Sequence, residues 1–166
     1  GMRTMTTAGD VNIQVGMATH VYLVTASMRD EYFFSADSEL LVVPQQGALS
    51  IQTELGWLDV APGEIALLPR GLAFSVQVQG PSRAYVCENH GAPFRLPELG
   101  PIGSNGLANP RDFLAPVAAY DARQDRPFEI IRKFGGRLWC TSQPRTPFDV
   151  VAWHGNLVPL KYDTAR

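Results

Sequence analysis

The chain has 166 residues, 45% of them hydrophobic, and its 14 basic and 16 acidic residues leave a formal net charge of −2. This length suits one domain that can bury a core without disulfide or metal staples. The nearly balanced charge gives no electrostatic reason to expect nucleic acid or an anionic membrane as a partner. Residues 2–10 lack the apolar stretch of a secretory signal, and no apolar run approaches the roughly 20 residues of a membrane span.

The amino terminus carries little structural information. Gly1 before Met2 is typical of a residue left after tag removal, so residues 1–8 are predicted to be a scar and a flexible start. Residues 9–166 are predicted to form one β-barrel domain. The two cysteines, Cys87 and Cys140, are too few and too far apart for a disulfide scaffold or a zinc site, and we interpret them as reduced core thiols. The protein is therefore expected to be cytoplasmic.

From residue 11 to residue 88, short β-prone runs are separated by Gly, Pro, Asn and Asp, which is typical of an all-β sandwich or barrel. The predicted strands cover residues 11–15, 20–25, 31–34, 40–43, 48–53, 57–60, 65–68, 74–78 and 83–88. No helical period of comparable length competes with them. Residues 54–57 (ELGW) predict a hairpin between two of these strands.

Residues 91–126 are predicted to be an irregular segment, rich in Gly and Pro in its first part and too apolar to be a free linker. Within it, Asn109 can cap a short helical turn. Residues 100–113 could line an active site or a subunit interface, or could form an ordered structural loop. Strands are predicted to resume at residues 128–134, 137–141 and 148–153, with Gly135 and Gly136 as the turn of a hairpin.

One spacing resembles the second sequence motif of the cupin superfamily: Gly63-x5-Pro69-x-Gly71-x2-Phe74-x3-Val78. In that motif a His and an Asn normally stand at the positions of Phe74 and Val78. The resemblance implies an all-β, cupin-like double-stranded β-barrel, or jelly roll, in which the glycines and the proline make the turns.

The first cupin motif, with two His and a Glu, can be aligned with the stretch that ends at Gly47. Leu40 then takes the Glu position. The two His positions fall on Phe34 and Ala36, or on Phe33 and Ser35. Because these residues offer no metal donors of the expected kind, the barrel is expected to have no metal site of its own.

The three histidines, His20, His90 and His154, are 70 and 64 residues apart, so they form no HxH or HxxxH pair. Before any resemblance is considered, each is interpreted as a surface or hydrogen-bonded structural His.

Three stretches resemble homogentisate 1,2-dioxygenase: residues 39–71, residues 96–116 with the run GPIGSNGLANPRDFL, and residues 148–162 with the run VVAWHGN. That family cleaves the ring of homogentisate with O2 to give maleylacetoacetate, in the breakdown of tyrosine and phenylalanine. Its Fe(II) is held by two His and one Glu in a carboxy-terminal cupin half. The resemblance therefore implies that this chain is a central or N-terminal cupin portion, lacks the iron ligands and is inactive alone.

The same resemblance implies a role for His154, which matches the family's active-site His that contacts a substrate hydroxyl and acts as its general base. It also implies homogentisate and O2 as substrates, and a homohexamer built from trimers, for the full-length enzyme. An alternative is a stand-alone metal-free cupin used for binding or assembly. A third hypothesis, a sugar-modifying or isomerising cupin, needs a polar lumen with a His–Asp type pair, and the apolar Leu40 and Phe74 argue against it.

Overall fold

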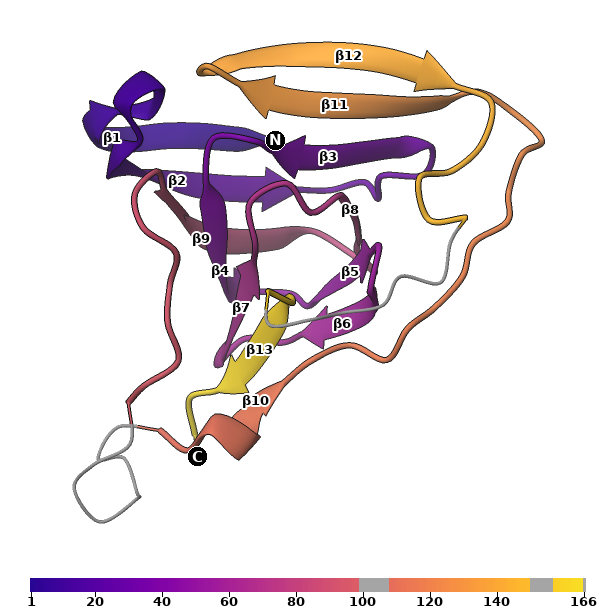
Figure 1. Cartoon of the computed structure of the whole chain (residues 1–166). Helices are drawn as coiled ribbons and strands as arrows, with labels where there is room; N and C mark the ends of the chain where they lie inside the picture. Colours follow the sequence, from indigo (N-terminus) through magenta and orange to yellow (C-terminus); the bar gives the residue numbers. More distant parts are fainter. Residues whose placement is uncertain (99–107, 150–156, 166) are drawn as a thin grey trace.

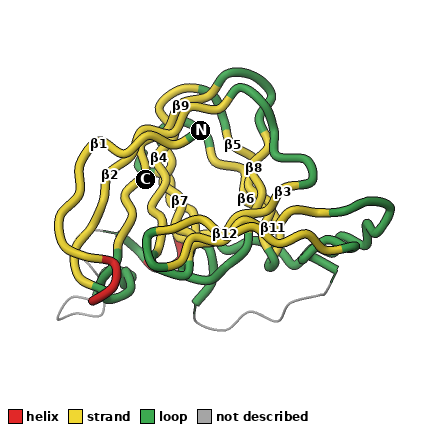
Figure 2. The backbone as a smooth tube through the Cα atoms, turned by 90° about the horizontal axis from the view of Figure 1, so that it is seen from above, coloured by secondary structure: helices red, strands yellow, loops and turns green. Residues whose placement is uncertain are grey.

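Two β-sheets face each other around a lumen in the computed structural model, which describes residues 1–98, 108–149 and 157–165 (Figures 1 and 2). The first sheet has seven strands in the order β1-β2-β9-β4-β7-β13-β10. The second has six, in the order β12-β11-β3-β8-β5-β6. The predicted all-β, cupin-like double-stranded barrel is therefore confirmed. In the described part of the chain, no helix has the length and apolarity of a membrane span.

The strand bounds follow the predicted runs closely across the middle of the chain. They are β1 Met2–Asp10, β2 Val15–Val24, β3 Glu31–Ser35, β4 Glu39–Gln46, β5 Leu49–Thr53, β6 Gly56–Val60, β7 Glu64–Leu68, β8 Phe74–Gln77, β9 Ser82–Asn89, β10 Phe113–Leu114, β11 Phe128–Phe134, β12 Arg137–Gln143 and β13 Leu160–Asp163. The hairpins predicted at residues 54–57 and at Gly135-Gly136 are present as β5–β6 and β11–β12.

The amino terminus differs from its prediction. Residues 2–8, expected to be flexible, belong to β1, which pairs with β2 along its whole length. Every residue of β1 is exposed, so the strand carries no alternating apolar pattern that would have revealed it. The strand predicted at residues 11–15 is wrong over Val11–Ile13, which form the 3₁₀ helix η1 after the Asp10 cap.

The predictions after residue 90 have mixed outcomes. Asn109 does cap a short turn, the 3₁₀ helix η2 (Pro110–Asp112), by accepting a hydrogen bond from the Arg111 backbone N–H. The strand predicted at residues 148–153 is wrong at Phe148 and Asp149, which lie in a turn and an irregular stretch. Its remaining residues are outside the described part of the chain. The strand at Leu160–Asp163 was not predicted.

Alternation along the strands divides the side chains between the lumen and the outer surface. In β9, Ser82, Ala84, Val86 and Glu88 are all buried, and the residues between them are more exposed. This period of two follows from the pleat of a strand. The core between the sheets collects the buried residues Val24, Leu40, Val42, Leu49, Ile51, Leu58, Val60, Ala66, Leu68, Phe74, Val76, Ala84 and Val86.

A second apolar cluster covers the outer face of the six-stranded sheet. Tyr32 of β3 is completely buried there, and its ring meets the ring of Phe148 edge-on with centroids 4.8 Å apart. Phe128 of β11 completes the cluster, and the Arg123 guanidinium lies over its ring at 5.4 Å. Arg123 also donates a 2.9 Å hydrogen bond to the Tyr32 hydroxyl. The segments before β11 and after β12 are thus packed onto the barrel rather than free.

The connection between β10 and β11 runs past the β5–β6 hairpin, where Gly56 lies close to Val117. Gly56 has a φ of +118°, and a Cβ built on it would lie 1.9 Å from the Val117 carbonyl oxygen. Gly63 also has a positive φ, +92°, but nothing lies within 4 Å of the Cβ position there. A comparison of substitutions at these two glycines therefore separates the cost of backbone strain from the cost of a steric clash with Val117.

We expect Gly56→Ala to destabilise the protein clearly more than Gly63→Ala. Both substitutions force a side chain onto a positive φ, which costs about 1–2 kcal/mol. Only the first also displaces the Val117 carbonyl. Urea unfolding of the two variants and the parent measures the difference. Equal losses of unfolding free energy would show that the close passage of Val117 over Gly56 contributes nothing.

Candidate functional site

The lumen of the barrel contains a cavity of about 410 Å³. Leu40 and Phe74, at the positions where the cupin motifs carry Glu and His, both line it. Phe33 lines it too, and its ring meets the Phe74 ring edge-on with centroids 5.5 Å apart. Phe34, the next residue, packs instead against the outer cluster. Of the two alignments of the first motif, the one that uses Phe33 is therefore the one that faces the lumen, and this wall is apolar as expected.

A polar cluster adjoins this apolar surface, since Glu88 is the cross-strand partner of Leu40, and the sequence interpretation missed it. Glu88 of β9 is only 1% exposed, yet it has three side-chain partners. Its Oε2 lies 3.0 Å from His20 Nε2 of β2, and its Oε1 accepts a 2.5 Å hydrogen bond from the Ser38 hydroxyl. Oε1 also accepts a hydrogen bond from the Lys133 ammonium of β11. Because Glu88 and Lys133 belong to different sheets, this ion pair links the two walls of the barrel.

The hydrogen bonds around Glu88 fix its charge. Burial by itself raises the pKa of this carboxyl group, but the hydrogen bonds from Lys133, Ser38 and His20 outweigh burial and hold the pKa below its ordinary value of 4.5. An ionised Glu88 can only accept, so His20 donates from Nε2. The other ring nitrogen, Nδ1, lies 3.0 Å from the Thr4 hydroxyl of β1 and accepts from it when the ring is neutral. We call Thr4, His20, Ser38, Glu88 and Lys133 the Glu88 cluster.

The hairpin that carries Lys133 is fixed at its turn by a second carboxylate. Asp37 is buried, and its two oxygens accept hydrogen bonds from the backbone N–H groups of Gly135 and Gly136 at 2.8 and 2.9 Å. The Ala36 N–H also donates to the Lys133 carbonyl. These bonds hold β11 in its parallel pairing with β3 and so set the position of the Lys133 side chain.

The three histidines have separate environments. His20 belongs to the Glu88 cluster and lines the lumen. His90 is 4% exposed, and its Nδ1 has no hydrogen-bond partner among the described residues. Burial lowers the pKa of His90 below its ordinary 6.5, although the nearby Glu88 carboxylate opposes this shift. His154, the predicted catalytic residue, lies outside the described residues, as does Asn105 of the GPIGSNGLANPRDFL run.

The described residues do not fit the iron that the resemblance implies. No group of three or more His, Cys, Asp or Glu in this part of the chain is arranged to hold a metal ion. The two donors that do meet, His20 and Glu88, already have hydrogen-bond partners, and the adjacent Lys133 ammonium repels a cation. Although His20 and Glu88 are of the types used for acid–base chemistry, their arrangement is that of a buried structural network.

The cysteines are less buried than predicted. Cys87 is half-buried, and Cys140 of β12 is exposed, so its interpretation as a core thiol is wrong. Strand β12 is the edge of its sheet and is exposed along nearly all of its length. The Cys140 thiol donates a hydrogen bond to a Glu129 carboxylate oxygen at 2.7 Å. This bond raises the pKa of the thiol and keeps it in the less nucleophilic protonated form.

A signal for the Glu88 cluster was present in the sequence. Strand β9 alternates strictly, and Glu88 falls in phase with the inward Ala84 and Val86. A charged residue in an inward position needs partners, because a lone buried charge is costly. The sequence could not name these partners, since His20 and Lys133 are 68 and 45 residues away along the chain.

We expect Lys133→Met to destabilise the protein by about 3–5 kcal/mol, because it leaves the buried Glu88 charge without its cation. The double variant Lys133→Met/Glu88→Gln should recover most of this loss. Arg132→Met is the matched control, since Arg132 is the exposed neighbour on the outer face of β11, and it should change the unfolding free energy by less than about 0.5 kcal/mol. Denaturant unfolding measures all four proteins; a double variant as unstable as the single one contradicts the pairing.

The pKa shifts of His90 and Glu88 predict that stability is lost in two steps as the pH falls. Unfolded His90 takes up a proton near pH 6.5 and the folded residue only at lower pH, so stability declines below about pH 6.5 with a slope of up to about 1.4 kcal/mol per pH unit. Glu88 stabilises the fold above pH 4.5, and this contribution is lost as the pH falls through its lowered folded pKa.

The melting temperature between pH 8 and pH 3 measures both steps. We expect His90→Gln to remove the upper step and to leave the lower one in place. An unchanged upper step in this variant would mean that another group causes it.

The comparisons with known proteins cover nearly the whole chain. The family model described as "Homogentisate 1,2-dioxygenase N-terminal" matches residues 1–164. A homogentisate 1,2-dioxygenase from Rhodopseudomonas palustris strain HaA2 is 61% identical over 164 residues, which are 98% of this chain and 36% of that protein. The enzyme of the same name from Bradyrhizobium diazoefficiens is 58% identical over 164 residues, with the same coverage. The chain thus spans about a third of the length of these relatives.

Among solved structures the likenesses are weaker. A cupin-2 domain protein from Shewanella frigidimarina has a TM-score of 0.44 and 15% identity, covering 54% of this chain and 79% of that one. An oxalate decarboxylase from Bacillus subtilis has a TM-score of 0.43 and 15% identity, covering 56% of this chain and 26% of that one.

Proposed function

Since the chain belongs to the homogentisate 1,2-dioxygenase N-terminal family, we propose that it forms the barrel portion of an enzyme that cleaves the ring of homogentisate with O2 to give maleylacetoacetate. The observation that carries this proposal is the match over residues 1–164 together with 61% identity to a named homogentisate 1,2-dioxygenase. We assign the reaction to a longer protein, because the named relative is about three times as long as this chain.

The proposed enzyme uses Fe(II), which on binding would supply the site where substrate and O2 meet. The lumen residues Leu40, Phe74 and Phe33 offer no donors, and His20 and Glu88 are engaged by other side chains. Both facts support an iron site in another part of the longer protein. The role proposed for this barrel is therefore to support the catalytic site and to contribute one residue to it.

That residue is His154, which we propose contacts a substrate hydroxyl and accepts its proton. Imidazole titrates near neutrality and can form a hydrogen bond to a phenol, as this step requires. Phe148 is buried against Tyr32, and Leu160 pairs with Leu67 of β7, so both sides of residues 150–156 are attached to the barrel.

Three further properties are part of the proposal. The full-length enzyme is a homo-oligomer, a hexamer built from trimers. It is cytoplasmic, in keeping with two free cysteines, one of them exposed. The barrel forms one domain, in which β1 is included because it pairs with β2 along its whole length.

The assay measures ring-opened product by its absorbance after addition of Fe(II) and homogentisate. We expect turnover from the full-length protein and none from the 166-residue chain alone. His154→Gln in the full-length protein should lower kcat by about 10²–10⁴-fold, the usual contribution of a general base, and should leave the iron content unchanged. Turnover by the 166-residue chain, or a His154→Gln enzyme as fast as the parent, would refute the corresponding part of the proposal.

A further inference from the structure

The lumen cavity has two different sides. Its larger part is lined by aliphatic and aromatic side chains from both sheets, among them Leu49, Ile51, Leu68, Phe74 and Val76. All five are at most 8% exposed, so this wall belongs to the apolar core. A volume of about 410 Å³ falls in the range of sites that hold small organic molecules, about 300–1,000 Å³.

The polar side of the cavity is made by strands β1, β2 and β11. Thr4, His20, Tyr22 and Lys133 line it there. Burial raises the pKa of Tyr22, so its phenol stays protonated and can donate a hydrogen bond. The Lys133 ammonium has three N–H groups, and the Glu88 carboxylate takes up one side of it. Hydrogen-bond donors therefore line part of an otherwise apolar space.

The charges on this side favour an anion. Among the described residues no Asp or Glu lines the cavity, and Glu88, bound by His20 and Lys133, is only 1% exposed. The groups that a ligand meets are thus a cation, two hydroxyls and an imidazole. A carboxylate bound here would add a negative charge to a cluster in which Glu88 and Lys133 already balance. The N–H groups of Lys133 that Glu88 does not take up are the donors that offset this charge.

We propose that the barrel lumen is a binding site for a small monocarboxylic acid with an aromatic or branched aliphatic body. The carboxylate accepts hydrogen bonds from Lys133 and from the Tyr22 hydroxyl, and the body packs against Phe33, Phe74 and the aliphatic wall. This site is separate from the proposed iron site, and it does not depend on the proposed catalytic function.

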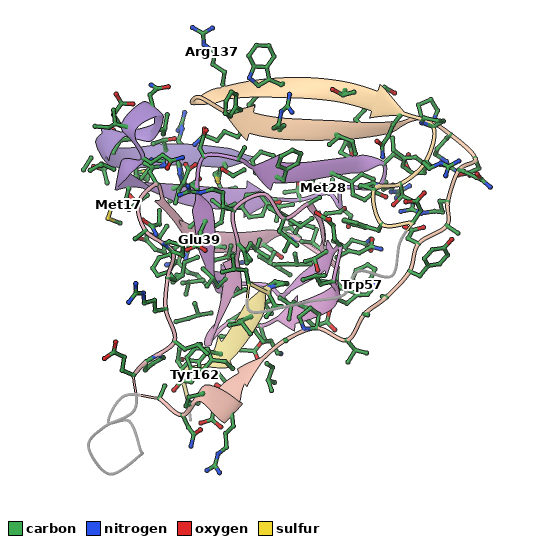
Figure 3. All side chains as sticks on the ribbon, viewed as in Figure 1. Met17, Met28, Glu39, Trp57, Arg137 and Tyr162 are labelled. Carbon is green, nitrogen blue, oxygen red and sulfur yellow. The ribbon has the colours of Figure 1, made fainter. Side chains whose placement is uncertain are left out.

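Met28 provides a local reporter for the test. It lines the cavity, its sulfur accepts a 3.4 Å hydrogen bond from the Val76 N–H, and it lies just below β3 in the view of Figure 3. In full-length protein labelled with ¹³C at the methionine methyl groups, Met28→Leu identifies its signal. Because this signal responds to the lumen, binding of a probe at a catalytic site elsewhere does not interfere.

The probes are 3-phenylpropionate and its uncharged counterpart 3-phenylpropan-1-ol. We expect the acid to shift the Met28 signal and to saturate at a concentration at least about tenfold lower than the alcohol. Lys133→Met/Glu88→Gln removes both charges of the buried ion pair together, so neither is left unpaired. This variant should lose the preference for the acid. Val76→Phe, which fills the apolar wall, should abolish the response to both probes. Arg132→Met removes a cation from the outer face of the same strand and should behave as the parent.

Three results would overturn the proposal. If neither probe shifts the Met28 signal at millimolar concentration, the lumen is closed core and not a binding site. If the alcohol binds as tightly as the acid, or if the acid preference survives in Lys133→Met/Glu88→Gln, the polar side does not select a carboxylate.

Discussion

The buried carboxylate of Glu88 is the constraint on which this barrel depends. A charge that is 1% exposed must be compensated, and here Ser38, His20 and Lys133 compensate it from three different segments of the chain. The partner in β11 brings a strand of the second sheet against the first. The apolar core determines that the two sheets pack together, whereas the Glu88 cluster determines how the β11–β12 hairpin is seated on them.

The outer segments add a second layer to the barrel. Phe148 and Arg123 come from either side of the β11–β12 hairpin, and both contact Tyr32 of β3. Strands β13 and β10 extend the seven-stranded sheet, with the Phe113 and Tyr162 rings stacked at 4.8 Å. Figure 3 shows Arg137, at the hairpin turn, directed away from the barrel. Of these side chains, Phe148 precedes residues 150–156 along the chain and Tyr162 follows them.

Local sequence signals predicted most of the barrel because its middle strands alternate and their turns carry Gly, Pro or Asn. Strand β11 was predicted with its observed bounds. Strand β1 was missed, since its nine residues are all exposed and its pairing with β2 supplies the order that its own pattern lacks. Cys140 was wrongly placed in the core, because an apolar run predicts a strand but not whether that strand lies at a sheet edge.

The sequence by itself determined the all-β class, the turn positions, the loss of metal donors at Leu40 and Phe74, and the family, because each of these is written in residues that are close together along the chain. Only the tertiary structure decided that Phe33 rather than Phe34 faces the lumen, and that His20 and Lys133 meet at Glu88. Those contacts join strands far apart in sequence. Their partners are chosen by sheet pairing and by the need to neutralise a buried charge, and neither is recorded in any local pattern.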